Sequence, residues 1–281
     1  MTSAGKTRGT SIFASVDLEG CATLVHWDEV RPSADAAYER ARRLMTSEVD
    51  AALRGAFSAG AANAIVNDSH SVMRNLLLDE LDPRVKVVSG RLKPQFMLQG
   101  IEGCDAAFFI GYHGAIGDAQ AVMGHTYSPR IIFECRLNGE PVGETTINAA
   151  LAGHYGVPVA LVSADRTTLE EVRRNLPWAV TVETKESIGY FAADSLSPSM
   201  VCGLLEEAGA RAMTRLPEMR PFSLAAPIEM EIDTQRTSQA DMLELVPGMR
   251  RTASRSVAYR AGDFAEIYRA LMAVIYLGAA G

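Results

Sequence analysis

The sequence has little of what nucleic-acid-binding or membrane-spanning proteins require. Its 281 residues carry a formal net charge of −7 and no long basic run, whereas binding to phosphate backbones needs a basic face. No stretch approaches 18 consecutive apolar residues, so the sequence predicts no transmembrane helix. The first ten residues, MTSAGKTRGT, are polar and do not resemble a signal peptide. We therefore expect neither nucleic acid nor a membrane as a partner.

Cysteine is scarce as well, and the four cysteines form no CxxC pair. They are Cys21, Cys104, Cys135 and Cys202. This spacing argues against a zinc ribbon and predicts reduced, mostly buried thiols in a cytoplasmic protein. The sequence also lacks HExxH, GxSxG and GxxxxGK(S/T), and no GxGxxG follows the first predicted strand. No standard catalytic or nucleotide-binding motif therefore identifies the function.

What the sequence does contain is a regular alternation of apolar strands and amphipathic helices. Strands are predicted at residues 11–17, 63–68, 85–90, 105–113, 157–165, 179–184, 227–233 and 255–261. Helices are predicted at residues 31–60, 145–156, 166–176, 198–216 and 264–277, with a hairpin at 130–144. Repeated strand–helix units are typical of an α/β protein with a largely parallel sheet flanked by helices. The last two strands alternate apolar and polar residues, which predicts a more antiparallel C-terminal lobe.

The same pattern sets the domain organisation that we expect. Residues 1–10 are predicted to form a disordered tail, residues 11–165 a metal-binding α/β catalytic core, and residues 166–281 a C-terminal α/β lobe. No linker rich in Pro, Gly or Ser marks the boundary, so a single domain is the alternative.

Two carboxylates at the end of the first predicted strand raise the question of function. In SIFASVDLEG, the apolar residues suit a sheet interior, but Asp17 and Glu19 follow two positions apart. Side chains alternate along a strand, so these carboxylates point to the same face and repel each other. A divalent cation between them would turn repulsion into coordination. Two solvated carboxylates at a strand end are the alternative.

Further candidate ligands follow other predicted strands. His70 comes after the second strand, His113 ends the strand at 105–113, and Glu144 follows the hairpin. His125 lies in the loop VMGHTYS. Because open α/β sheets bind ligands at the carboxyl ends of their strands, these side chains could converge. Taken singly, each has a structural alternative: a local turn made by Asp68, an acid at a helix N-terminus, or a buried imidazole.

This set of side chains points to a pair of metal ions. Carboxylates together with imidazoles suit zinc, with manganese or cobalt as alternatives. Three carboxylates and two imidazoles exceed what one tetrahedral zinc ion takes, which favours two metals bridged by a carboxylate. Such a site lowers the pKa of a bound water and polarises a carbonyl. The sequence therefore predicts a hydrolase.

The order and spacing of these segments resemble a known family. SVDLEG, VNDSHS, GYHG, GHTYS and NGEPVGETTINAALAGHYGVPVALVSAD, followed by LSPS and ELVPGM, are similar to successive blocks of the DppA-type D-aminopeptidases, which are dizinc metallopeptidases. The resemblance extends over nearly the whole chain. The segment GAIGDAQAVMG between His113 and His125 departs from the family pattern, and this departure bears on substrate preference.

The resemblance implies a function, a site and an assembly. It implies a zinc-dependent aminopeptidase that releases N-terminal D-amino acids from short peptides, with two Zn²⁺ per subunit. It also implies a homo-oligomer, such as a ring-like decamer. The metal ligands that it implies are Asp17, Glu19, His70, His113 and Glu144, with Asp17 as the bridge. His125 matches the catalytic residue, as base, acid or nucleophile, and no substrate-binding residue is identified.

Two other functions are compatible with the sequence. One is a metallohydrolase that acts on another amide or peptide, which substrate profiling would distinguish. The other is a non-catalytic peptide-binding protein, which a turnover assay would distinguish. Lys185, in ETKES, is a candidate partner for a substrate carboxylate, with an ordinary surface lysine as the alternative. His26 and His154 are expected to be structural.

Overall fold

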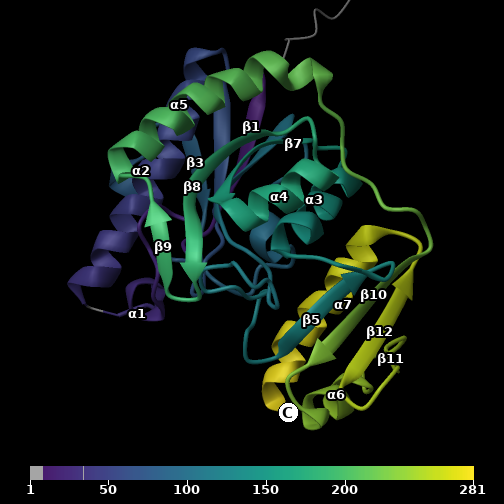
Figure 1. Cartoon of the computed structure of the whole chain (residues 1–281). Coiled ribbons are helices and arrows are strands. Elements are labelled where there is room, and N and C mark those ends of the chain that lie inside the picture. The colour runs from purple at the N-terminus through teal and green to yellow at the C-terminus, as the bar shows by residue number, and fades with distance from the viewer. Residues whose placement is uncertain (1–8, 34) are drawn as a thin grey trace, which may run out of the picture.

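The computed structural model describes residues 9–33 and 35–281 and contains a large, mostly parallel sheet beside a smaller antiparallel one (Figure 1). The strands of the large sheet, in spatial order, are β3 (Val85–Val88), β2 (Asn63–Asp68), β1 (Ser11–Val16), β4 (Ala106–Tyr112), β7 (Val159–Asp165), β8 (Val180–Gly189) and β9 (Ala192–Ser195). All neighbours are parallel except β8 and β9. This sheet confirms the predicted α/β class. The tail predicted for residues 1–10 falls mainly on residues 1–8, outside the described part of the chain.

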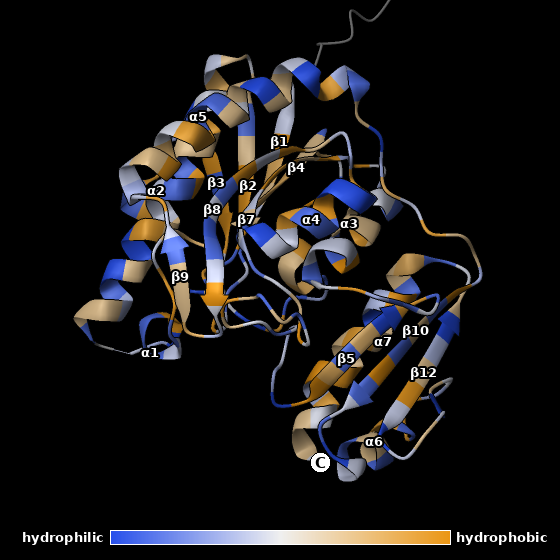
Figure 2. Ribbon diagram, in the orientation of Figure 1, coloured by the Kyte–Doolittle hydropathy of each residue, from blue (hydrophilic) through white to orange (hydrophobic). Residues whose placement is uncertain are grey.

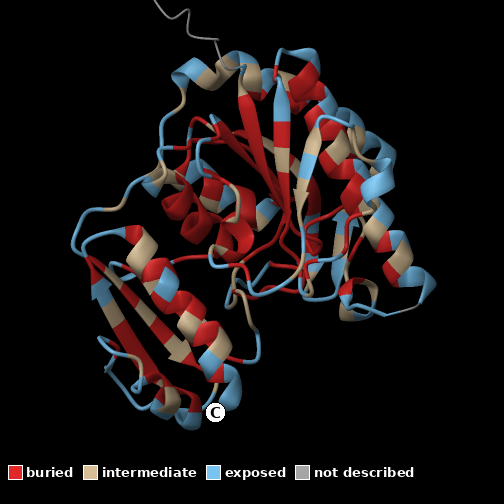
Figure 3. Ribbon diagram, turned by 180° about the vertical axis from the view of Figure 1, so that it is seen from behind, coloured by how far each residue is buried: buried red, intermediate tan, exposed pale blue. Residues whose placement is uncertain are grey.

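Helices cover both faces of the large sheet. The α-helices of the described residues are α1 (Trp27–Val30), α2 (Ala36–Ser58), α3 (Glu144–His154), α4 (Arg166–Asn175), α5 (Pro198–Arg215), α6 (Thr237–Leu243) and α7 (Phe264–Leu277). Of these, α2, α3, α4 and α5 cover the large sheet. On one face, α2 and α5 share a core with Ile12 and Val16, whereas α3 and α4 share the opposite core with Phe13. Both α2 and α5 carry hydrophobic and hydrophilic residues (Figure 2), as helices that cover a sheet do. The central strands between the two helical layers are buried (Figure 3). Burial of both faces explains the continuous apolar strands.

No helix among the described residues combines the length and the apolar character needed to cross a lipid bilayer.

The smaller sheet is antiparallel throughout and packs against the C-terminal helices. Its strands, in spatial order, are β11 (Arg250–Arg251), β12 (Ser256–Ala261), β10 (Ile228–Thr234), β5 (Ile132–Leu137) and β6 (Glu140–Pro141). In β10, Ile228, Met230 and Ile232 are buried in one core with residues of α3 and α7. The chain passes between the sheets repeatedly, because β5 and β6 precede β7. The boundary expected at residue 165 stays a prediction.

Most predicted elements are confirmed, and the exceptions have local causes. Asn138 and Gly139 have φ values of 50° and 88°, as a tight hairpin turn requires. The helix predicted at 31–60 instead begins at Ala36, because Arg31 is extended before Pro32. The structure also contains α6, β9 and β11, which were not predicted. Their seven, four and two residues are too few to show a diagnostic periodicity.

The strand order places a crevice at the carboxyl ends of β1 and β4. The chain leaves β1 towards β2 and β3 on one side, whereas β4, β7 and β8 extend the sheet on the other. Ligands of α/β sheets bind at such a switch point. The loop after β1 lies against β4, since the Gly20 N–H donates to the Gly111 carbonyl at 2.9 Å. A Cβ at Gly20 would lie 1.7 Å from the Tyr112 carbonyl oxygen, so only glycine fits there.

Candidate metal centre

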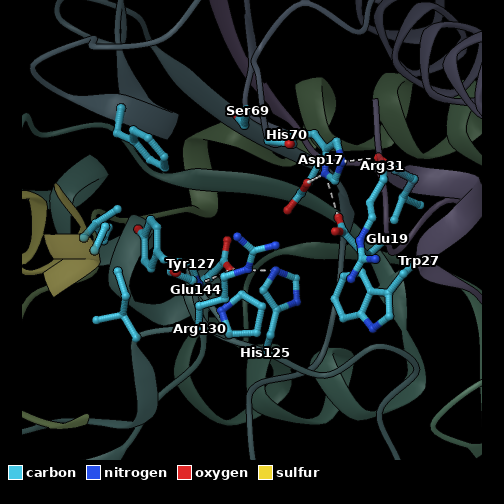
Figure 4. Close-up of a pocket in the computed structure, with 18 of the residues that line it drawn as sticks. Asp17, Glu19, Trp27, Arg31, Ser69, His70, His125, Tyr127, Arg130 and Glu144 are labelled. Atoms are coloured by element: carbon cyan, nitrogen blue, oxygen red, sulfur yellow. Dashed lines mark hydrogen bonds and ion pairs between the residues drawn. The ribbon is translucent and has the colours of Figure 1, made fainter. Parts of the chain in front are cut away.

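The structure brings all six candidate side chains together in one buried cluster, and Figure 4 shows five of them: Asp17, Glu19, His70, His125 and Glu144. They come from loops at the carboxyl ends of three neighbouring strands, from the N-terminus of α3 and from the loop between β4 and β5. They are Asp17, Glu19, His70, His113, His125 and Glu144, and each is at most 7% exposed. The solvated alternative for the two strand-end carboxylates is therefore wrong.

His70 connects the two carboxylates that follow β1. Its Nδ1 lies 3.0 Å from Asp17 Oδ1 and 2.9 Å from Glu19 Oε2. Its Nε2–H donates to the Val30 carbonyl at 2.7 Å, which fixes the ring and leaves Nδ1 as the ligand atom. Burial acts to lower the pKa of His70, but Glu19 and Asp17 outweigh burial and hold it well above its usual value. Metal binding at Nδ1 would therefore displace a proton.

His113 and Glu144 form the other half of the cluster. His113 Nδ1–H donates to the Gly114 carbonyl at 3.0 Å, which turns Nε2 towards the carboxylates. Nε2 lies 3.5 Å from Asp17 Oδ2 and 3.5 Å from Glu144 Oε1. Glu144 is the first residue of α3, and its Oε1 accepts the Tyr127 N–H at 2.6 Å. The acid at the helix N-terminus thus also faces the cluster.

His125 lies beside this second half and faces the cavity. Its ring stacks on His113 with centroids 4.1 Å apart, and Trp27 meets it edge-on at 5.3 Å. Its Nδ1–H donates to the Met123 carbonyl at 3.0 Å, and its Nε2 lies 3.9 Å from Glu144 Oε1. Burial lowers the pKa of His125, so the imidazole is neutral at neutral pH.

The cluster has the properties of a metal-binding site. Among the described residues, His113 Nε2 is buried without a hydrogen-bond partner, and the carboxylate oxygens of Asp17 and Glu144 lie 3.5 Å from it. Buried carboxylates are costly unless they are paired or coordinate a metal. Two groups of three side chains have ligand atoms within 4.8 Å of one another: Asp17, Glu19 and His113, and His113, His125 and Glu144. Carboxylates and imidazoles in this arrangement fit zinc. The division into five ligands and one catalytic histidine stays a prediction.

The other histidines and Asp68 are not part of the cluster. His26 is the N-cap of α1 and accepts the Asp28 N–H, and His154 ends α3. Asp68 accepts the backbone N–H groups of Asn75 and Leu76, so it holds the loop that follows β2.

A cavity of about 1220 Å³ opens onto the cluster. Trp27 and Tyr190 line it from the side of the large sheet, and Gln235 and Gln239 from the side of the smaller sheet. This volume exceeds the roughly 300–1,000 Å³ of small-molecule sites. The cavity can therefore hold a short peptide next to the cluster, of which Asp17, Glu19, His70, His125 and Glu144 line it.

Lys185 was interpreted either as a partner for a substrate carboxylate or as an ordinary surface lysine, and the structure supports neither interpretation. Lys185 is 1% exposed, and its ammonium donates to the carbonyls of Glu19, Cys21 and Leu24. Glu48, also buried, accepts the Ala22 N–H at 2.8 Å, and burial raises the pKa of Glu48 to about 7. Together they hold the loop that carries the first two carboxylates.

A shift in strand register explains why the sequence did not reveal this role. Ala164 pairs with Glu183, but the next residue, Asp165, pairs with Lys185. The extra residue in β8 breaks the alternation, so Thr184 and Lys185 are both buried. Such a bulge has no signature in the residues themselves.

Replacing Lys185 by methionine is expected to destabilise the fold by about 2–4 kcal/mol. Three buried carbonyl groups would lose their donor, and each unsatisfied group costs about 1–3 kcal/mol when relaxation is incomplete. Urea unfolding measures the change, with the exposed Lys86→Met as the control. Equal midpoints for the two variants would contradict the role assigned to Lys185.

Comparison with known proteins gives consistent results. The family model described as D-aminopeptidase matches residues 11–273. The chain is 34% identical over 271 residues to the D-aminopeptidase of Bacillus subtilis (strain 168), covering 95% of this chain and 97% of that protein. It also matches the structure of the "Zn-dependent D-aminopeptidase DppA from Bacillus subtilis, a self-compartmentalizing protease", with a TM-score of 0.91 and 32% identity, over 97% of this chain and 99% of that one. The similarity thus spans both sheets and the cluster between them.

Proposed function

The chain belongs to the D-aminopeptidase family, and we propose that it is a zinc-dependent aminopeptidase that releases N-terminal D-amino acids from short peptides. The observation that carries this proposal is the buried cluster of three carboxylates and three imidazoles, which opens onto a cavity of peptide size. The similarity to a Zn-dependent D-aminopeptidase supports both the metal and the substrate class.

Asp17 is proposed as the bridge between two zinc ions. Its Oδ1 faces His70 and its Oδ2 faces His113, so this carboxylate lies between the two imidazoles. One ion would be held by Asp17, Glu19 and His70, and the other by Asp17, His113 and Glu144. Each ion would then have two carboxylates and one imidazole, which leaves a position open for substrate.

His125 is proposed to carry the proton during hydrolysis. Zinc ions at this centre supply Lewis-acid polarisation and a nucleophile at neutral pH. Because His125 Nδ1–H is bound to the Met123 carbonyl, Nε2 is the atom that can exchange a proton. His125 Nε2 accepts a proton from the attacking water and returns it to the leaving nitrogen as the C–N bond breaks. The products are a free D-amino acid and the shortened peptide.

We also propose that the chain assembles with copies of itself, as a ring-like decamer. The description of the solved relative as self-compartmentalizing supports self-assembly. Exposed apolar side chains at the turn between β8 and β9, namely Ile188, Tyr190 and Phe191, offer a surface for such contacts. A cytoplasmic location remains a prediction from the cysteine pattern.

Removal of the metal is the direct test of this function. The purified enzyme is expected to contain about two zinc ions per chain and to cleave a dipeptide with a D-residue at its N-terminus. Chelation should abolish turnover because the ligands alone cannot polarise the scissile carbonyl, and added zinc should restore it. The control is the same dipeptide with an L-residue first, which should be cleaved more slowly. Turnover that survives complete removal of zinc would contradict the proposal.

A further inference from the structure

Outside the metal cluster itself, the charged side chains that line the cavity are basic, whereas the chain as a whole is acidic. Among the residues that the structure describes, the acidic side chains that line the cavity are Asp17, Glu19 and Glu144, which belong to the cluster. Four arginines also line it: Arg31, Arg91, Arg130 and Arg236. The chain as a whole has a net charge of −7. A basic wall on an acidic protein indicates that the cavity receives an anionic group.

The side chains of these arginines are available to a ligand. Within the part of the chain that the structure describes, none of the four forms an ion pair with a carboxylate. By contrast, arginines such as Arg54, Arg136 and Arg166 pair with acidic residues on the surface. A guanidinium group without a partner is suited to bind a carboxylate through two parallel hydrogen bonds.

Arg31 and Arg130 are placed on the walls of the cavity next to residues of the metal centre (Figure 4). Arg31 follows α1, and its guanidinium lies 5.8 Å from the centroid of the Trp27 ring, which in turn contacts His125. Arg130 comes three residues after Tyr127, whose backbone N–H donates to Glu144. The carbonyl of Arg130 accepts a hydrogen bond from the side-chain amide of Gln239 at 2.9 Å. The main chain that carries each arginine is therefore fixed relative to the cluster.

The chemistry of a peptide substrate identifies the anion. In an aminopeptidase the first peptide bond lies at the metals, so the C-terminal carboxylate of a dipeptide or tripeptide lies one or two residues away, within about 7 Å. A longer peptide would carry its carboxylate out of reach. We propose that Arg31 and Arg130 form a subsite for the C-terminal carboxylate of short peptides, an inference that rests on the proposed function. This subsite selects peptides by length as well as by the presence of a free C-terminus.

The test compares a tripeptide that has a free C-terminal carboxylate with the same tripeptide as a C-terminal amide. For the wild type, kcat/KM is expected to be about 10–100-fold higher for the acid, mainly through KM, as expected for a charged hydrogen bond. In the double variant Arg31→Gln, Arg130→Gln, the ratio should fall towards one. Arg211→Gln, at an exposed position of α5, is the matched control and should keep the wild-type ratio. Zinc content, measured for every variant, shows that the centre is intact.

Two outcomes would overturn the subsite. A wild-type ratio near one, or an equal loss for acid and amide in the double variant, would show that the arginines do not read the carboxylate. If the wild type cleaves neither peptide, the proposed function fails separately, and calorimetric binding of the same two peptides then decides. If the wild type binds the tripeptide acid more tightly than the amide, and the double variant loses this difference, the subsite is still supported. If the wild type binds the acid and the amide equally, the subsite is excluded.

Discussion

Replacing His125 by alanine is expected to lower kcat for a dipeptide with an N-terminal D-residue by about 10²–10⁴-fold, the usual contribution of a positioned proton carrier. The zinc content should stay at the wild-type level. The reason is geometric: Nδ1 is bound to the Met123 carbonyl, and Nε2 lies 3.9 Å from the nearest oxygen of Glu144. The ring therefore lies beside the proposed ligands and is not needed to hold them.

Elemental analysis and steady-state kinetics on the same preparation check this expectation. His154→Ala is the matched control, because His154 is exposed at the end of α3 and should retain full turnover. Loss of one zinc ion from His125→Ala would contradict the assigned role. That result would make His125 a zinc ligand together with His113 and Glu144. The ligand atoms of these three side chains lie within 4.8 Å of one another.

Replacing Asp17 by asparagine is expected to remove both zinc ions and with them all measurable turnover. The substitution keeps the shape of the side chain but replaces one carboxylate oxygen by an amide nitrogen, which cannot ligate zinc. Loss of a residue that only supports a ligand costs about 10–100-fold in metal affinity, and loss of a bridging ligand should exceed this range. Burial opposes ionisation of Asp17, but the neighbouring imidazoles of His113 and His70 outweigh burial and lower the pKa of Asp17.

The measurement is the zinc content after dialysis against a fixed free zinc concentration, with Asp79→Asn at an exposed position as the control. The wild type and the control should keep about two ions per chain. An Asp17→Asn variant that keeps both ions would show that Asp17 is not the bridge, and the two-metal arrangement would need a different carboxylate. Circular dichroism of the variant distinguishes loss of metal from loss of fold.

The sequence predicts the large sheet and the convergence of the site because both depend on local patterns. Apolar runs such as 106–112 are buried on both faces, and the polar residues that end parallel strands meet at the same edge of the sheet. Asp17, His70 and His113 follow three neighbouring strands and therefore needed no long-range information. The catalytic role predicted for His125 came from the family resemblance, since its position in a loop soon after His113 made it only one of several candidates.

Other parts of the site depend on tertiary structure that the sequence does not display. Lys185 is buried because of a register shift between β7 and β8. Arg31 and Arg130 lie in two loops far apart in the sequence, and both line one cavity only after the two sheets have packed. Their charges give no indication of this, because surface arginines are common in any soluble domain.

The three imidazoles of the centre share one feature that affects how the protein can tolerate mutation. Each is oriented by a main-chain carbonyl, from Val30, Gly114 or Met123, and none by a carboxylate side chain on its outer nitrogen. A point substitution can delete a supporting side chain, but it leaves a carbonyl group in place. The orientation of the rings is therefore robust to single substitutions in their surroundings. Changes that do disturb it must move the backbone itself.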